Sequence, residues 1–219
     1  DSITSGEGGR GPVSFMEWVP MVFCASDNYT RITADALKAQ YQVISQSGWG
    51  VVGSWDNNPA CNLPGIYDEV CGPMAMDGTP NMGCEKPYDF AFQPDTVVVA
   101  LGANDHNAIG CAPYTDPVSG KTNKLTDSDA DMARYEAACA DFLTHLHAKN
   151  PQARLVWISF RHDGPIPAAI QRAVKRVQAQ GVPAEYGEPL DMDKPIRGGI
   201  GSRSHPSIQA HKRIAQALV

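Results

Sequence analysis

The sequence has few charges, no long apolar run and no phosphate-binding loop, and each lack excludes a class of protein. Only 19% of its 219 residues are charged, and lysine and arginine are scattered through a chain of net charge −6. A nucleic-acid groove or a contact with an anionic membrane is therefore not expected. No apolar segment approaches the ~20 residues that cross a bilayer. Because phosphate and dinucleotide fingerprints are missing as well, no cofactor is expected.

The cysteines also lack a metal-binding pattern. None of them forms a Cys-x-x-Cys pair, so a zinc site has little support. Their number is even, and the chain is rich in proline and glycine. These features favour a secreted or periplasmic protein with up to three disulfides, with buried reduced thiols as the alternative. The spacing does not choose a pairing, although Cys61 and Cys71 are close enough to close one loop. The six are Cys24, Cys61, Cys71, Cys84, Cys111 and Cys139.

Short apolar runs alternate with amphipathic stretches, which is typical of βαβ units and a parallel sheet. The predicted strands are Gln42–Ser45, Thr96–Leu101, Leu155–Phe160 and a weaker one at Ala184–Gly187. The predicted helices are Thr30–Tyr41, Asp127–Asn150, Ala168–Gln180 and a last one that starts at His205-Pro206-Ser207. In the first helix, Ile32, Ala36 and Leu37 are expected to lie on one face. The length suits one domain over residues 1–219.

Two stretches with little periodicity, residues 51–94 and 106–126, follow strand ends and are expected to be long loops over the active face. Four short segments carry the chemistry. They are Asp1–Gly6, Ser45–Gly50, Gly102–Asp105 and Ser204–Ser207, and they supply Ser, Gly, Asn and His in that order.

These residue types suit acyl transfer. A serine hydroxyl is a weak nucleophile and needs a nearby base, so Ser2 is the candidate nucleophile and His205 the candidate base. The tetrahedral intermediate carries an oxyanion that needs hydrogen-bond donors. The backbone N–H groups of Ser2 and Gly50 and the side-chain amide of Asn104 could supply three. Asp105 is expected to be structural and to bond local backbone at the strand end.

Asp-Ser-Ile-Thr at 1–4, Gly50, Gly-Ala-Asn-Asp at 102–105 and His-Pro-Ser at 205–207 together resemble the SGNH (GDSL-like) hydrolase superfamily. Ser-Gly-Trp-Gly-Val at 47–51 and Gly-Ser-Arg-Ser-His-Pro-Ser at 201–207 resemble its carbohydrate esterase family 2. The resemblance implies a three-layer α/β/α, flavodoxin-like fold with a parallel central sheet. It also implies metal-free removal of acetyl groups from plant polysaccharides or oligosaccharides, so the expected partner is an acetylated carbohydrate. A monomer is expected.

The sequence departs from that superfamily in two places. The positions two and three before the histidine, where an acid is usual, are Arg203 and Ser202. A Ser-His dyad is therefore predicted, with a backbone carbonyl or Ser202 holding the imidazole; the alternative is a carboxylate such as Asp191 or Asp193. The superfamily's first strand precedes Asp-Ser, so upstream residues are expected. In the resembling esterases an N-terminal β-sandwich often precedes this point.

Four further residues are candidates for substrate binding, each with a plainer alternative. Trp49 and Trp55 could stack on sugar rings or pack in the core or a lid. His106 could touch substrate or lie in a surface loop, and Arg203 could bind a polar or acidic substrate group or pair with a surface carboxylate. His211 competes with His205 as the base, but it lies inside the last helix and is expected to face solvent or to pack.

Two other functions remain open from the sequence. An O-acyltransferase would use the same residues to pass the acyl group to a sugar hydroxyl. A non-catalytic glycan-binding module would explain the missing acid, although retention of the serine, glycine, asparagine and histidine argues against it.

Overall fold

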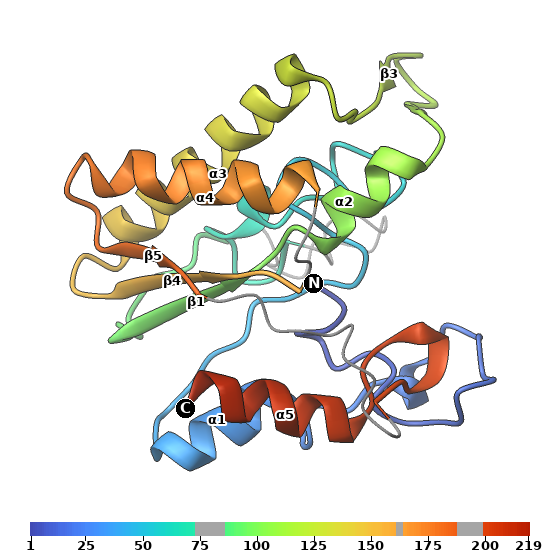
Figure 1. Ribbon diagram of the computed structural model, residues 1–219, viewed down its shortest axis with the longest axis vertical. Helices are drawn as coiled ribbons and strands as arrows, with labels where there is room; N and C mark the ends of the chain where they lie inside the picture. The colour runs from blue at the N-terminus through green and yellow to red at the C-terminus, as the bar shows by residue number, and fades with distance from the viewer. Residues whose placement is uncertain (73–85, 161–163, 188–198) are drawn as a thin grey trace. The chain divides into compact units, whose positions relative to one another are not determined.

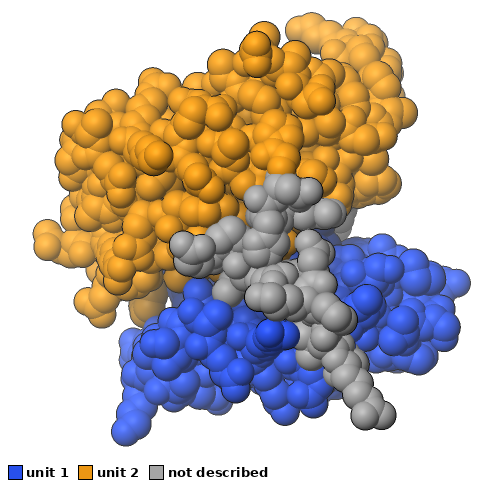
Figure 2. Space-filling view, in the orientation of Figure 1, with its two compact units in different colours: residues 1–48, 190–219 blue, residues 49–189 orange. Residues whose placement is uncertain are grey.

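The structure is a computed structural model that describes residues 1–72, 86–160, 164–187 and 199–219. It separates into two compact units, which Figure 2 distinguishes by colour. Unit 1 comprises residues 1–48 and 190–219, and unit 2 comprises residues 49–189. The candidate nucleophile and base belong to unit 1, whereas Gly50 and Asn104 belong to unit 2.

Unit 2 contains a parallel sheet. Its strands are β1 (Thr96–Ala100), β4 (Arg154–Ile158) and β5 (Ala184–Tyr186), hydrogen-bonded in the order β1-β4-β5. Val98 lies opposite Val156 in the register. Runs of β-branched and aromatic residues favour this extended conformation. Three of the predicted strands are therefore confirmed, each to within two residues.

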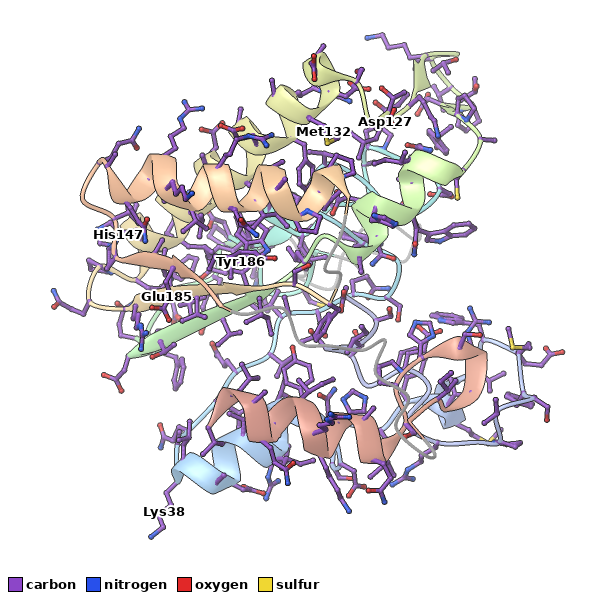
Figure 3. The ribbon with its side chains drawn as sticks, in the orientation of Figure 1. Lys38, Asp127, Met132, His147, Glu185 and Tyr186 are labelled. Carbon is purple, nitrogen blue, oxygen red and sulfur yellow. The ribbon has the colours of Figure 1, made fainter. Side chains whose placement is uncertain are left out.

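Three helices accompany this sheet: α2 (Ala103–Gly110), α3 (Asp129–Lys149) and α4 (Pro165–Gln178). Helices α3 and α4 pack against each other on the same side of the sheet (Figure 1). In Figure 3, Met132 lies near the beginning of α3 and His147 near its end. Apolar side chains at intervals of three and four residues build the core between these helices and the strands. Its fully buried members include Tyr135, Cys139, Leu143, Leu155, Trp157, Ile170 and Val177.

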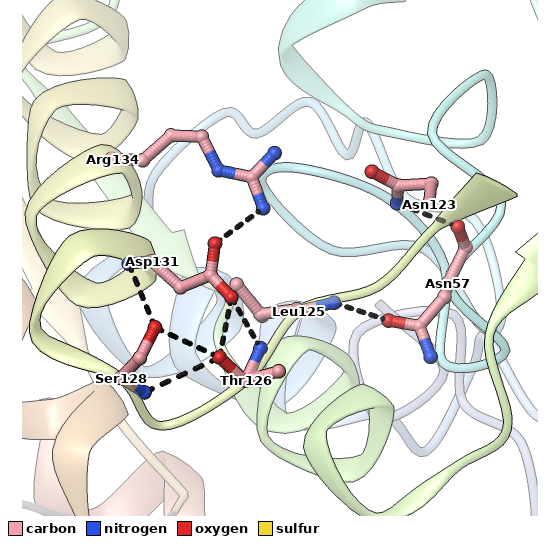
Figure 4. Close-up of polar contacts among 7 residues, drawn as sticks. All are labelled: Asn57, Asn123, Leu125, Thr126, Ser128, Asp131 and Arg134. Carbon is pink, nitrogen blue, oxygen red and sulfur yellow. Dashed lines mark hydrogen bonds and ion pairs between the residues drawn. The ribbon is translucent and has the colours of Figure 1, made fainter. Parts of the chain in front are cut away.

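A polar network fixes the beginning of α3 (Figure 4). Ser128 is the N-cap and accepts a bond from the Asp131 N–H, while the Asp131 carboxylate accepts two from Thr126. Asn57 extends the network, because its side chain accepts a bond from Leu125 N–H at 2.9 Å and its carbonyl accepts one from Asn123. The two long segments that the sequence analysis assigned to loops are thereby tied together.

Unit 1 is built around α1 (Tyr29–Leu37) and α5 (Ile208–Leu218), which pack together, with short 3-10 turns η1 (Pro20–Val22) and η4 (Ser202–Ser204). Ser207 caps α5, its side chain accepting a bond from Ala210 N–H, so the predicted start of the last helix is confirmed.

Two predictions in unit 1 are wrong. Residues 42–45 form no strand, and Val43 and Ile44 remain more than 40% exposed. The described part of unit 1 contains no strand with which this short run could pair. The predicted extent of the first helix, Thr30–Tyr41, is also wrong, because α1 ends at Leu37. Leu37 is 54% exposed, and the buried positions of α1 are Tyr29 and Ala34. The helix packs through small and aromatic residues rather than through its aliphatic ones.

The second predicted loop contains regular structure. Residues 103–110 form α2, and β2 (Tyr114–Thr115) pairs with β3 (Thr122–Asn123) as an antiparallel ribbon. Of the first predicted loop, residues 73–85 lie outside the described residues, and the remainder contains the 3-10 turn η2 (Pro64–Ile66). Short polar helices carry weak periodicity, which explains why the sequence pattern missed α2.

No disulfide joins any two of the cysteines within the described ranges, and Cys84 lies outside them. Cys139 is completely buried in α3, and burial raises the pKa of its thiol well above the ordinary value. This side chain therefore behaves as a small apolar core residue. In the part of the chain that is described, no helix is long and apolar enough to cross a membrane.

Candidate functional site

Consecutive turns hold the candidate nucleophile. The Asp1 side chain accepts bonds from the N–H groups of Ile3 (3.0 Å) and Thr4 (3.2 Å), and the Asp1 carbonyl accepts from Ser5. The Ser2 carbonyl accepts a bond from Glu7 N–H at 3.0 Å. Ser2 itself is only 8% exposed. An aspartate that bonds backbone two and three residues ahead is a turn-former, so Asp1 orders the segment that carries Ser2.

The candidate base is held by the backbone two residues before it. His205 Nδ1 lies 2.8 Å from the carbonyl oxygen of Arg203. Because a carbonyl can only accept, Nδ1 carries the hydrogen, and the lone pair is on Nε2, the atom that a general base needs. The predicted backbone-carbonyl support for the imidazole is present. Ser202, the other predicted support, donates instead to the Arg10 carbonyl at 2.7 Å.

Arg203 reaches this position through an unusual backbone conformation. Its φ is 55° and that of Ser204 is 58°, so both adopt the left-handed conformation that non-glycine residues rarely adopt. Such conformations persist only where the surrounding structure enforces them. The Arg203 side chain is anchored at both ends of its guanidinium, donating to Glu7 at 2.6 Å and to the Met16 carbonyl at 2.6 Å.

Glu7 is a functional candidate that the sequence analysis missed. Its side chain is 3% exposed, and its two oxygens accept from Arg203 and from the Ser47 hydroxyl, each at 2.6 Å. The Oε1 atom lies 3.8 Å from His205 Nδ1. Arg203 therefore pairs with a carboxylate, as one of its two predicted roles required, but that carboxylate is buried rather than at the surface. The available signal was an acid close to Ser2 and an arginine where an acid is usual.

In unit 2, Asp105 organises the segment that contains Gly50. Its carboxylate accepts bonds from the N–H groups of Val51 and Val52 at 3.0–3.1 Å and lies 3.4 Å from the Tyr135 hydroxyl. A Cβ on Gly50 would collide with this carboxylate. Burial raises the pKa of Asp105 to about 6. Asp105 is structural, as predicted, but it bonds the 51–52 segment rather than local backbone alone.

The predicted role of Gly50 as an oxyanion donor is not supported, because its N–H already donates to the Gly53 carbonyl at 2.8 Å. Asn104 is a better candidate. It is the second residue of α2, is 7% exposed, and donates one amide hydrogen to the Trp49 carbonyl at 2.9 Å. The bond to Trp49 fixes the orientation of the amide, which carries a second hydrogen.

The predicted substrate-binding residues lie in contrasting environments. Trp49 is 8% exposed and belongs to the hydrophobic core of unit 2, whereas Trp55 is 51% exposed. His106 is half-buried on α2 rather than in a loop. Asp191 and Asp193, the alternative acids, lie outside the described residues.

Trp18, which the sequence analysis did not single out, is 60% exposed and stands edge-on to Phe23, with ring centroids 6.0 Å apart. It lines a cavity of about 330 Å³ in unit 1 together with Ser5, Pro20, Phe23, Gln46 and Ser47.

His211 is excluded as a surface base. It is completely buried, its Nδ1 accepts from Tyr29 N–H at 3.4 Å, and its ring stacks on Tyr29. Burial, with a smaller contribution from His205, lowers its pKa to about 4. Within the described residues, no group of three or more His, Cys, Asp or Glu side chains is arranged to hold a metal ion.

No protein-family model matches the sequence. A curated acetylxylan esterase / glucomannan deacetylase of Cellvibrio japonicus (strain Ueda107) is 31% identical over 202 residues, covering 89% of this chain and 47% of that protein. A second of the same name is 23% identical over 193 residues. The chain thus spans about half the length of the curated relatives it matches.

Solved structures share the fold of this chain. An acetyl xylan esterase, Est2A, from Butyrivibrio proteoclasticus has a TM-score of 0.87 at 33% identity and covers 99% of this chain and 60% of its own. A family two carbohydrate esterase from Clostridium thermocellum, in complex with cellohexaose, has a TM-score of 0.74 at 21% identity, covering 100% of this chain and 60% of its own. These neighbours confirm the predicted fold class. The chain is an SGNH hydrolase in fold and resembles the carbohydrate esterases of family 2.

Proposed function

We propose that this protein is a serine esterase that removes O-acetyl groups from plant-type polysaccharides or oligosaccharides. The observation that carries the proposal is the hydrogen bond between His205 Nδ1 and the Arg203 carbonyl, because it leaves the imidazole oriented with a basic Nε2. Ser2 lies in the same unit, in a segment ordered by turns. The relatives named acetylxylan esterase / glucomannan deacetylase support acetylated carbohydrate as the substrate class.

In the proposed mechanism, Ser2 Oγ bonds to the acetyl carbonyl carbon while its proton passes to His205 Nε2. The carbon–oxygen bond to the sugar then breaks, and His205 returns the proton to the departing sugar oxygen. Water repeats the sequence in reverse: His205 takes its proton, the hydroxide adds to the acetyl group, and acetate leaves as Ser2 regains its hydrogen. No metal or cofactor takes part in these steps.

The oxyanion of each tetrahedral intermediate needs donors that are already in place. We assign this role to the Ser2 backbone N–H and to the second amide hydrogen of Asn104. The Asn104 amide is suited to it because its bond to Trp49 restricts rotation. Gly50 contributes differently, since its lack of a side chain lets the Asp105 carboxylate approach and order the neighbouring backbone.

For the carbohydrate, we propose that the exposed face of Trp18 carries a sugar ring at the cavity of unit 1. Indole rings suit pyranose faces, while the Ser5 and Gln46 side chains at the same cavity offer polar groups to sugar hydroxyls. Since such substrates are polymers outside the cell, we also propose that the protein is secreted or periplasmic.

The test is hydrolysis of p-nitrophenyl acetate by the wild type, Ser2→Ala and Ser14→Ala, followed by acetate release from acetylated xylan and glucomannan. Ser14 is exposed in the same unit and provides the matched control. Turnover that is lost only in Ser2→Ala and that falls from acetate to butyrate to octanoate supports the proposal. If no ester is turned over in a Ser2-dependent way, the esterase assignment fails, and equilibrium binding to the same polysaccharides then tests the glycan-binding alternative.

A further inference from the structure

The candidate base has no acid at the expected sequence positions, yet a carboxylate faces it in unit 1. Glu7 Oε1 lies 3.8 Å from His205 Nδ1, too far for a hydrogen bond but close enough for an electrostatic interaction. The carboxylate is almost completely buried and is held by Ser47 on one oxygen and Arg203 on the other. Burying a charge costs free energy. A buried carboxylate that is held by two short hydrogen bonds is therefore expected to serve the structure or the chemistry.

The ion pair between Glu7 and Arg203 acts on the group that supports the imidazole. The Arg203 carbonyl accepts a hydrogen bond from His205 Nδ1. Arg203 has a left-handed backbone conformation, which is unfavourable for a non-glycine residue and needs contacts that maintain it. The anchors on Arg203 are its side-chain bonds to Glu7 and to the Met16 carbonyl and its N–H bond to the Phe15 carbonyl at 2.9 Å. Of these three anchors, only Glu7 is charged.

We propose that Glu7 is a positioning residue that replaces the missing triad acid, fixing the Arg203 carbonyl through its ion pair and presenting negative charge to His205. The acid thus lies in the turn that follows the nucleophile rather than in the segment that carries the base. Because Glu7 N–H also bonds the Ser2 carbonyl, this one residue connects the segments that carry Ser2 and His205. This inference rests on the proposed esterase function and adds a residue to its machinery.

The charged and titratable groups around His205 have different expected effects. The Arg203 guanidinium opposes a protonated imidazole, but it is bonded to Glu7, whose Oε1 lies 3.8 Å from His205 Nδ1. His211, on α5, also interacts electrostatically with His205. It is neutral at pH 7, because its pKa is lowered to about 4. Glu7 is therefore the negative group in position to favour the imidazolium that forms during each proton transfer.

The experiment compares kcat and KM for p-nitrophenyl acetate in Glu7→Gln, Arg203→Met, the double variant and Glu17→Gln. Glu17 is exposed in the same unit and controls for the change in charge. Glu7→Gln is expected to lower kcat by about tenfold to hundredfold with KM within about twofold, less than the ~10⁴ for an acid that holds the histidine directly. Glu17→Gln is expected to leave both unchanged.

Because both single changes break the same ion pair, Arg203→Met is also expected to lower kcat, and the double variant should lose little more than Glu7→Gln. Arg203→Lys, which keeps a cation for Glu7, should recover much of the loss. If Glu7→Gln does not fold, Arg203→Met and its rescue by lysine decide the question. A kcat for Glu7→Gln or Arg203→Met within twofold of wild type, while Ser2→Ala is inactive, overturns this inference and leaves the esterase assignment standing.

Discussion

Gly8 lies directly against His205, so close that a Cβ on Gly8 would overlap the Cβ of the histidine. The same atom would also stand 2.6 Å from the Ser202 carbonyl oxygen. Gly8 has a φ of +79°, in the region that favours glycine. Two independent constraints, backbone conformation and space, therefore require glycine at this position, and both bear on the placement of the candidate base.

Gly8→Ala is expected to destabilise unit 1 by about 1–3 kcal/mol and to lower kcat more than the stability loss explains, because His205 must move. The free energy of unfolding and the kcat for p-nitrophenyl acetate measure the two effects. Gly120→Ala is the matched control, since Gly120 has a φ of +68° and open space around it. If the two variants have the same activity, a side chain at position 8 does not displace His205, and the prediction is wrong.

Asn104→Ala removes the proposed side-chain donor to the oxyanion and is expected to lower kcat by about 10²–10³-fold with little change in KM. Gln152→Ala, an exposed amide in the same unit, should have no effect. Steady-state kinetics at saturating ester measure the difference. A loss that appears in KM alone would contradict a role in the transition state.

Trp18→Ala is expected to raise KM for acetylated xylan or glucomannan severalfold while leaving p-nitrophenyl acetate turnover within about twofold, because the small ester has no sugar ring to stack. Trp18→Phe retains an aromatic face and should show a smaller effect. Equal losses of activity on the polymer and on the small ester would show that Trp18 stabilises the structure rather than binds carbohydrate.

The buried Asp105 carboxyl makes the stability of unit 2 depend on pH. Its native pKa of about 6 exceeds the ordinary value of 3.8, so the native state binds more protons than the unfolded state between these values. Stability from this group therefore falls by on the order of 3 kcal/mol as pH rises from about 4 to 6. The wild-type minus Asp105→Asn difference in unfolding free energy, measured by urea titration across this range, should fall accordingly. A constant difference would show that the carboxyl does not titrate there.

The buried His211 makes the stability of unit 1 depend on pH in the opposite direction. Its native pKa of about 4 lies below the ordinary value of 6.5, so the native state binds fewer protons than the unfolded state between these values. Stability from this group is present above pH 6.5 and is lost as pH falls through 4, again by on the order of 3 kcal/mol. His211→Phe, which keeps a ring against Tyr29, should remove this loss. The wild-type minus variant difference should rise from pH 4 to 6.5, and a flat profile would mean that the ring is not held neutral.

The sequence by itself determined the parallel strands, most helices and the order of the candidate residues Ser2, Asn104 and His205. These depend on local information: β-branched runs for strands, three- and four-residue spacing for α3 and α4, and a cap at Ser207 for α5. The absence of an acid beside His205 also led to two predicted supports for its imidazole, a backbone carbonyl or Ser202, and the structure shows the carbonyl.

Only the tertiary structure decided which distant residues hold the candidate residues within each unit. Glu7 meets Arg203 across 196 positions, and Asp105 bonds Val51 across 54, separations at which no periodicity reports a contact. Tertiary packing likewise buried Trp49 in the core, left Trp18 exposed at a cavity, and kept residues 42–45 from forming a strand. Burial and ion pairing depend on which distant segments the folded chain brings together, and that is a property of the whole fold rather than of any sequence window.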